Sequence, residues 1–421
     1  MSDNYPEITD LLKKGKLKEA LHNINNISNH EENFELISLK GSIYLKLEEY
    51  KNSYDNFSIA IGLKKNSFNC FISRAIALFE LGEFKRSILD FEEGLKINSD
   101  SPAIFENIGK CYSNLGKNEK ALEYYQKALD LSPENNRIIE MIAEKLSETN
   151  FTTRRKNIII DTDSSIRKIK YNYFTNSKLK DVEIKDLIHK AENYIDNNFK
   201  NLIFNQTQIF RKNNFNLNCD RHFLIFRQFK VIPEFCFSCI KVTINVDNVV
   251  DLIKLFLIFN NISLKENNLR KCMIDLRVNA KTNYKGFIYC RSIEEAHNIK
   301  ELLDSIIKNT ISNKLSSIIK RGCSEFNKHF QGYEDVSKKL VNYNSEWKKY
   351  EYLIDNKYQK FQNMKKKQET VKGISFYDIM IIRNWLIFAR ITKDETYKKI
   401  TDKILINPQL EKIISQNKIN N

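Results

Sequence analysis

Residues 101–133 read SPAIFENIGKCYSNLGKNEKALEYYQKALDLSP, and this stretch decides the fold of the first third of the chain. Its apolar residues recur at helical spacing in two blocks, which predicts a helix–turn–helix unit. Small residues at Gly109 and Ala128 let the two helices approach closely, while Tyr112 and Tyr125 fill the gaps between one unit and the next. The stretch therefore predicts one hairpin of a helical stack.

The same pattern recurs with a period of 34 residues across residues 1–148. A weaker copy opens the chain at Gly15 and Ala20, and residues 134–148 are expected to form a closing helix. Four units and a cap are enough for a stable solenoid, because each hairpin buries its apolar face against the next. The period is visible at Gly41, Ala75 and Gly109, at Tyr44, Leu78 and Tyr112, at Phe57, Phe91 and Tyr125, and at Ala60, Gly94 and Ala128.

These repeats resemble the tetratricopeptide repeat (TPR), a helix–turn–helix unit of 34 residues. The resemblance implies a concave groove that binds a peptide or docks a protein. A dimerisation surface and a purely intramolecular scaffold are the alternatives. Lys40 and Arg74 stand where the pattern has apolar residues, and one unit alone keeps its closing proline, Pro133. The resemblance therefore leaves the identity of the ligand open.

The charge of the chain is distributed unevenly. A length of 421 residues allows two or three domains, and the net charge is +15. Residues 1–150 hold 19 Lys and Arg against 24 Asp and Glu, whereas the remainder holds 49 against 29. We therefore expect the C-terminal part to meet an acidic partner such as RNA, an anionic membrane face or an acidic protein. The alternative is a Lys-rich surface with no partner.

The sequence predicts a cytoplasmic protein without a membrane span. Residues 1–10 are acidic and lack the apolar stretch of a signal peptide, and no run of about 18 uncharged apolar residues occurs. In a reducing compartment, the eight cysteines are expected to be thiols or metal ligands rather than disulfides.

Three further segments follow the repeats. Residues 149–180 are polar and basic and are expected to be a linker, residues 181–330 a Cys-rich basic α+β domain, and residues 331–421 a C-terminal helical extension. The α+β domain begins with an expected helix over 181–202. Extended stretches are then expected near 207–211 and 222–232.

The clearest pattern in the middle domain has the order β-α-β-β-α-β, which resembles the ferredoxin-like fold. That topology implies the strand order 4-1-3-2, with the first strand antiparallel to the third and fourth. The full expectation is thus an α+β protein: an N-terminal TPR α-solenoid, a ferredoxin-like domain and closing C-terminal helices. The expected elements are strands over 240–246, 272–278, 286–291 and 316–322 and helices over 249–261 and 293–307.

Cysteines lie where this topology brings one pole of the sheet together. Cys236 and Cys239 precede the first strand, Cys290 ends the third, and Cys323 follows the fourth. Four thiolates gathered in this way could hold one zinc ion or an iron–sulfur cluster. Buried packing thiols and a redox pair are the alternatives. Cys272 begins the second strand, at the far edge, and is left out of the predicted site.

The same strand order is used by RNA-recognition motifs. Lys285-Gly286-Phe287-Ile288-Tyr289 resembles the start of their ribonucleoprotein octamer, and the base-stacking aromatics of that family correspond to Phe287 and Tyr289. A covered sheet face is the alternative, since Cys290 and Ser292 depart from the octamer. Four cations are expected to share the face with the aromatics: Lys241, Arg277, Arg291 and Lys320.

Two functions follow from these patterns. The first is a docking adaptor whose repeats bind a protein or peptide, while a basic domain, stiffened by a Cys-bound metal, contacts RNA or another acidic partner. The second is a metalloenzyme, or its partner subunit, that acts at a Cys-ligated centre on a substrate held by the repeats. No phosphate-binding glycine loop or hydrolase motif is found, so no catalytic residue can be named from the sequence.

Overall fold

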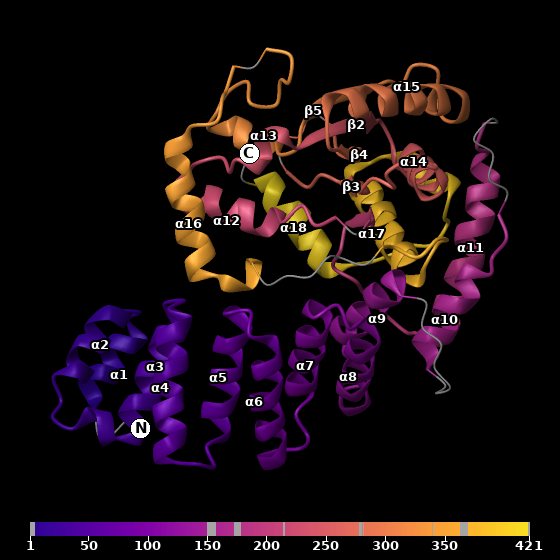
Figure 1. Ribbon diagram of the computed structural model, residues 1–421. Coiled ribbons are helices and arrows are strands. Elements are labelled where there is room, and N and C mark those ends of the chain that lie inside the picture. Colours follow the sequence, from indigo (N-terminus) through magenta and orange to yellow (C-terminus); the bar gives the residue numbers. More distant parts are fainter. Residues whose placement is uncertain are drawn as a thin grey trace. The chain divides into compact units, whose positions relative to one another are not determined.

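The structure is a computed structural model that describes residues 5–149, 157–171, 178–213, 215–277, 280, 282–338, 340–362 and 369–419. The chain forms two compact units (Figure 1). The first contains Met1–Glu134 and Lys349–Lys365, and the second contains Asn135–Lys348 and Lys366–Asn421. One segment near the C-terminus therefore belongs to the N-terminal unit, although the chain on both sides of it belongs to the other.

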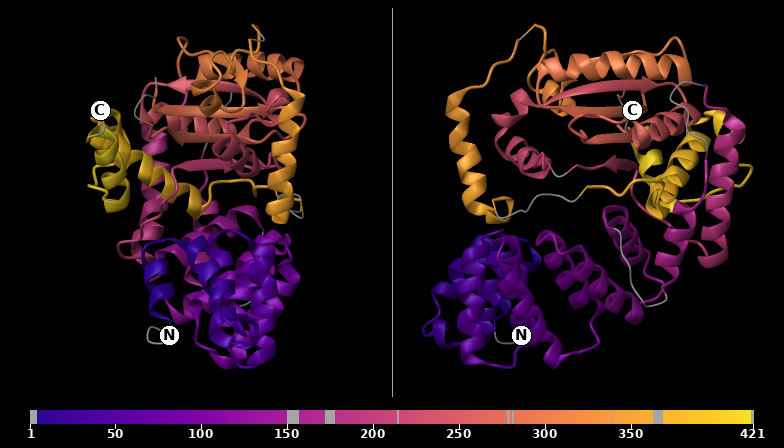
Figure 2. Two further views of the ribbon diagram at one scale, coloured as in Figure 1. Left: turned by 90° about the vertical axis from the view of Figure 1, so that its left-hand side faces the viewer. Right: turned by 45° about the vertical axis from the view of Figure 1, so that its right-hand side comes forward.

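The first unit is a row of antiparallel helix pairs, which can be followed in Figure 2. Each predicted hairpin is present, so the helical repeat array is confirmed. Its helices are α1 (Pro6–Lys13), α2 (Leu17–Asn25), α3 (Phe34–Lys46), α4 (Tyr50–Leu63), α5 (Phe68–Glu80), α6 (Phe84–Ile97), α7 (Pro102–Asn114) and α8 (Asn118–Leu131), followed from the distal segment by α16 (Lys348–Lys357) and the short 3-10 helix η4 (Gln359–Phe361).

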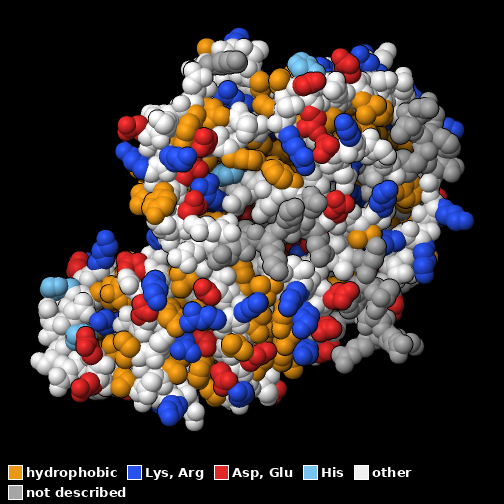
Figure 3. All heavy atoms as spheres, viewed as in Figure 1, with side chains coloured by type: hydrophobic (Ala, Val, Ile, Leu, Met, Phe, Trp, Pro, Cys, Tyr) orange, Lys and Arg blue, Asp and Glu red, His pale blue; other side chains and the backbone are white. Residues whose placement is uncertain are grey.

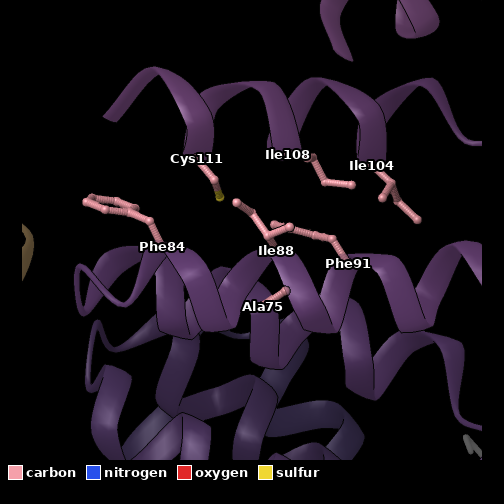
Figure 4. Close-up of a cluster of buried hydrophobic side chains, with 7 residues drawn as sticks. All are labelled: Ala75, Phe84, Ile88, Phe91, Ile104, Ile108 and Cys111. Atoms are coloured by element: carbon pink, nitrogen blue, oxygen red, sulfur yellow. The ribbon is translucent and has the colours of Figure 1, made fainter. Parts of the chain in front are cut away.

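The core between hairpins is built from large side chains of one helix that meet aliphatic side chains of the next. In Figure 4, Phe84, Ile88 and Phe91 of α6 lie between the two helices, on the side where α7 carries Ile104, Ile108 and Cys111. Close approach within a hairpin depends on the small residues. A Cβ on Gly109 would lie 2.4 Å from a ring carbon of Tyr125, which is 2% exposed. The predicted role of the small residue at position 109 is confirmed.

Each hairpin turn contains one residue in the left-handed backbone region. Gly15, Gly82 and Gly116 adopt φ of 71°, 76° and 69°, as expected for glycine after a helix end. The second turn carries Glu48 instead, with φ of 60°. The backbone amide of each of these residues donates to the carbonyl three residues earlier, at 3.0–3.1 Å, so the four turns share one geometry.

The second unit is built around a five-stranded antiparallel sheet in the order β1-β3-β4-β2-β5. The four predicted strands have the expected order, read from β5 to β3. The predicted extended stretch at 207–211 adds a fifth strand at the β3 edge. The strands are β1 (Gln208–Arg211), β2 (Ile240–Val246), β3 (Arg270–Ile274), β4 (Tyr284–Cys290) and β5 (Ser317–Arg321).

Helices cover this sheet. Leu255 and Phe259 of α14 occupy the space that a side chain at Gly286 would need, so α14 packs closely against β4. The α-helices of this unit are α9 (Asn136–Glu148), α10 (Ile158–Arg167), α11 (Asp181–Asn198), α12 (Cys219–Phe229), α13 (Phe235–Ser238), α14 (Val249–Asn261), α15 (Ile293–Thr310), α17 (Phe376–Thr392) and α18 (Pro408–Ile419). Its 3-10 helices are η2 (Ser324–Lys328), η3 (Ser345–Trp347) and η5 (Glu395–Lys399), and a further 3-10 helix, η1 (His30–Glu32), lies in the first unit.

Helix α17 is the centre of the second unit. Trp385 is fully buried and donates from its indole nitrogen to the Thr207 carbonyl at 2.8 Å. Asp378, in the first turn of α17, accepts two hydrogen bonds from the Arg211 guanidinium of β1, at 3.0 and 2.9 Å. Both side chains of this bidentate pair are buried. The pair fixes α17 against the added edge strand.

Four expectations about segment boundaries and types differ from the structure. The closing helix α9 packs with α10 and α17 and belongs to the second unit. The expected linker contains α10, and the stretch at 222–232 is the helix α12 rather than extended. The tail is divided between both units. The two elements whose type was wrong, α10 and α12, are short segments whose structure depends on the surface that buries them, which local periodicity does not report.

Candidate functional site

The last repeat presents a row of aromatic side chains that are only half-buried. Phe105 and Tyr112 of α7 flank Tyr124 of α8, with ring centroids 6.3 and 5.3 Å from the Tyr124 ring. Lys127 lies over Tyr124, with its Nζ 4.5 Å from the ring centroid, and Lys120 lies over Tyr112 at 5.5 Å. Burial raises the pKa of both tyrosines, so their hydroxyls stay protonated and able to donate.

Arg74 explains one departure from the repeat pattern. Its guanidinium donates to both carboxylate oxygens of Asp90 at 2.7 and 2.8 Å and lies over the rings of Tyr54 and Phe71. The hydrogen bond that Arg74 donates to Asp90 raises the pKa of Arg74. The ion pair between Arg74 and Asp90 therefore links α5 to α6.

On the face drawn in Figure 3, Lys and Arg side chains lie among Asp and Glu side chains and hydrophobic patches over the array.

The predicted cysteine pole forms, but its thiols face different ways. Cys290 pairs with Ile240 across the sheet, so these two side chains share one face. Cys239 precedes Ile240 and therefore faces the opposite side. Its sulfur lies 2.5 Å from where a Cβ on Gly322 would be. The topology thus brings the cysteines to one end of the sheet and separates Cys290 from Cys239 by the sheet itself.

Cys236 and Cys323 form a pair within an aromatic cluster that includes Phe326 and Tyr333. The Cys236 thiol donates to the Cys323 sulfur, which raises the pKa of Cys236 and lowers that of Cys323. Burial raises the pKa of Cys239 to about 12. The raised pKa values keep Cys236 and Cys239 protonated, as the alternative of packing residues would have them.

No group of three or more His, Cys, Asp or Glu side chains is arranged to hold a metal ion within the part of the chain that the structure describes. The four predicted ligands therefore do not fit a single tetrahedral ion as they lie here. Zinc and iron–sulfur binding stay predictions. Cys272, which was left out of the predicted site, is buried on β3, and His222 stacks on Phe235 with ring centroids 5.3 Å apart.

The predicted nucleic-acid residues are brought together in part. Phe287 pairs with Thr243 on β2 and lies between two lysines, with the Nζ atoms of Lys241 and Lys271 at 4.6 and 5.3 Å from its ring centroid. Phe287 is only 7% exposed, so its ring has little surface for a base, whereas Tyr289 is half-buried. Stacking on these aromatics stays a prediction.

The other predicted cations have carboxylate partners. Arg277 contacts Asp275 at 2.6 Å and Glu325 at 3.3 Å, Arg291 contacts Glu266 at 3.0 Å, and Lys320 contacts Glu334 at 3.0 Å. Their charge is partly neutralised within the chain, which weakens their pull on a phosphate backbone.

Lys241 and Lys271 differ from these cations. The Nζ of Lys241 donates to the Gly322 carbonyl at 2.6 Å, and that of Lys271 donates to the Gln208 amide oxygen at 3.2 Å. Burial lowers the pKa of Lys241 to about 8 and also lowers that of Lys271. Lys241 is buried and Lys271 is half-buried, and the pair forms a cationic spot whose hydrogen-bond acceptors are neutral oxygens.

Comparison with known proteins finds the same kind of repeat in the helical array. The family model described as tetratricopeptide repeat matches residues 102–135. The "DnaJ homolog subfamily C member 7" of Mus musculus is 26% identical over 123 residues, which are 27% of this chain and 25% of that protein. The "Protein CTR9 homolog" of Arabidopsis thaliana is 39% identical over 67 residues, 16% of this chain and 6% of that protein. The chain thus spans a quarter or less of the length of these relatives.

Parts of two solved structures are similar to part of this chain. MamA from Desulfovibrio magneticus RS-1 is 22% identical, with a TM-score of 0.32 over 33% of this chain and 78% of that one. YrrB, titled "a TPR protein with an unusual peptide-binding site", is 22% identical, with a TM-score of 0.30 over 32% and 71%. With the family match and the array, the N-terminal part of the chain is a tetratricopeptide-like repeat domain.

Sequence reasoning missed the lysine–glutamate contacts that fix α9. The half-buried Lys212 lies between Glu144 and Glu148, and its Nζ is 3.3 Å from the Glu144 carboxylate. No helix in the described part of the chain is long and apolar enough to cross a bilayer.

Proposed function

We propose that this chain is a docking protein whose repeat array binds a segment of another protein. Proteins with this repeat bind other proteins, and the aromatic row on the last repeat is the observation that carries the proposal. Phe105, Tyr112 and Tyr124 keep part of their rings at the surface, beside lysines that hold them in place. Aromatic side chains of this kind supply most of the binding energy at many interfaces.

A displayed peptide library tests the proposal. Selection on the full-length chain should enrich peptides that bind with micromolar affinity, and Phe105→Ala/Tyr124→Ala should weaken the selected peptides at least tenfold. Tyr194→Ala is the matched control, because Tyr194 is 43% exposed but lies in the second unit. Failure to enrich any peptide, or equal loss in the control, would rule out docking at this row.

A second candidate is that the basic unit contacts an acidic partner such as single-stranded RNA. We infer a ferredoxin-like core from the strand order β5-β2-β4-β3. The spot at Lys241 and Lys271 supports the candidate, since a bound phosphate would supply the negative charge that these two ammonium groups, one buried and one half-buried, lack. Labelled polyuridine should bind at low salt and weaken steeply as salt rises. It should also bind at least tenfold more weakly to Lys241→Met/Lys271→Met; no binding at low salt would exclude the candidate.

A further inference from the structure

One helix of the chain is held on the repeat array although its flanks belong to the other unit. In α16 and the residue after it, Ile354 and Tyr358 are 1% and 4% exposed, whereas Tyr352 and Leu353 are 66% and 52% exposed. Residues four apart lie on the same face of a helix. The segment therefore buries one narrow face, as a docked amphipathic peptide does.

The segment contacts the array through one aromatic pair and through polar contacts with two carboxylates. The Tyr358 ring packs edge-on against Tyr50, with centroids 5.9 Å apart, and its hydroxyl donates to the Glu48 carboxylate. Lys357 lies 3.7 Å from the same carboxylate, and Lys360 donates to Glu80. The array thus contributes the carboxylates of Glu48 and Glu80 and the ring of Tyr50. The segment contributes the ammonium groups of Lys357 and Lys360 and the ring of Tyr358.

The backbone at Glu48 is an independent sign of function. The three equivalent turns use Gly15, Gly82 and Gly116 in the left-handed region, whereas Glu48 adopts it with a side chain, at a cost of about 1 kcal/mol. The turn forms the same hydrogen bonds with glycine, so its geometry does not need the glutamate. What the glutamate adds is the carboxylate that meets Lys357 and Tyr358.

The ion pair between Glu48 and Lys357 contributes little to the hold on the segment. The Glu48 and Lys357 side chains are 51% and 39% exposed, and exposed ion pairs contribute only about 0–1 kcal/mol each. Because the segment is tethered to the array, its effective concentration is on the order of 1 mM. A partner present at lower concentration must therefore compete with it.

We propose that residues 348–362 are a built-in ligand that occupies a docking site formed by Glu48, Tyr50 and Glu80. The partner that displaces it is a helical basic–aromatic peptide with the pattern Ile-x-x-x-Tyr-x-Lys. This inference rests on the proposed docking function and adds the partner's chemistry and an autoinhibited resting state. The site lies at the hairpin turns of the first repeats, apart from the aromatic row on the last repeat.

Peptide binding to the full-length chain tests the inference. The probe is a labelled peptide, KKYEYLIDNKYQKFQ, which copies residues 348–362. Tyr358→Ala/Lys360→Ala in the chain should release the segment and tighten peptide binding at least tenfold over the unsubstituted chain, as measured by fluorescence anisotropy. Lys360→Glu alone should act in the same direction if the double variant fails to fold.

Two controls make the result specific. Adding Glu48→Gly and Glu80→Gln to the released chain should abolish binding, while Glu48→Gly leaves the turn with the residue that its neighbours use. A peptide carrying the Tyr358→Ala and Lys360→Ala changes should not bind. Equal peptide affinity for the released and unsubstituted chains, or no binding to either, would overturn the inference. If library-selected peptides still bind the array in that case, the docking function stands alone; if they fail as well, both proposals fall.

Discussion

Single residues decide how closely the helices of each hairpin approach. At Gly109, an added methyl group would collide with the Tyr125 ring, which is buried and cannot move aside. Gly62 of α4 has no atom within 4 Å of the same position. The two glycines therefore form a matched pair for one substitution.

We expect Gly109→Ala to lower the free energy of unfolding of the first unit by about 1–3 kcal/mol through overpacking. This loss should appear although alanine favours a helix over glycine by about 1 kcal/mol. Gly62→Ala should be neutral or stabilising by up to that amount. Urea unfolding followed by circular dichroism measures both, and equal stability of the two variants would contradict the packing argument.

A residue-scale pH effect is expected at Glu148. Burial alone raises the pKa of this carboxyl, but Lys212 and Lys145 outweigh burial and lower the pKa to about 2. Because the pKa in the folded state is lower than in the unfolded chain, the contribution to stability is complete above about pH 4.5 and is lost as the pH falls toward 2.

Glu148→Gln should therefore lower the free energy of unfolding of the second unit at pH 7 by up to about 3 kcal/mol, since one pKa unit corresponds to about 1.4 kcal/mol. The difference from the unsubstituted chain should shrink to near zero by pH 2. Thermal unfolding across pH 2–7 measures this, with Glu301→Gln, at an exposed position of α15, as the control. A pH-independent difference would mean that the charge of Glu148 contributes nothing.

At the scale of elements, the sheet pole gives a test of the thiols. Seven of the eight cysteines are buried, and Cys219, at the start of α12, is half-buried. We expect one thiol to react quickly with a disulfide reagent in the native chain and this reaction to disappear in Cys219→Ser. The other seven should react only on unfolding.

The same assay decides the metal prediction. Thiols bound to zinc would become reactive after a chelator is added to the native chain, and mass spectrometry would find one equivalent of metal per chain. Chelator-independent reactivity without bound metal would leave Cys236, Cys239, Cys290 and Cys323 as packing residues.

Elements with strong local patterns could be predicted, and elements stabilised by distant surfaces could not. The hairpins followed from small residues at period 34, and the strand order followed from the β-α-β-β-α-β pattern. The helix α12 was expected as a strand because apolar residues run together in it. At the pole, the shared site of the four cysteines stays a prediction, because the facing of Cys239 and Cys290 depends on strand register, which the sequence leaves unspecified.

At the scale of the whole molecule, two compact units share one chain that passes from the second to the first and back. The segment around α16 was expected simply as part of a C-terminal helical extension, because nothing in its sequence names Glu48 and Glu80, roughly 300 residues away, as partners. Its assignment to the array is the central claim, since the built-in ligand depends on it.

Hydrogen–deuterium exchange of the full-length chain tests this claim most directly. We expect the amides of 350–358 to be protected, and this protection to fall in Glu48→Ala/Glu80→Ala while that of α5 and α6 is kept. Amides of 350–358 that exchange as fast in the unsubstituted chain as in an isolated peptide would contradict the claim.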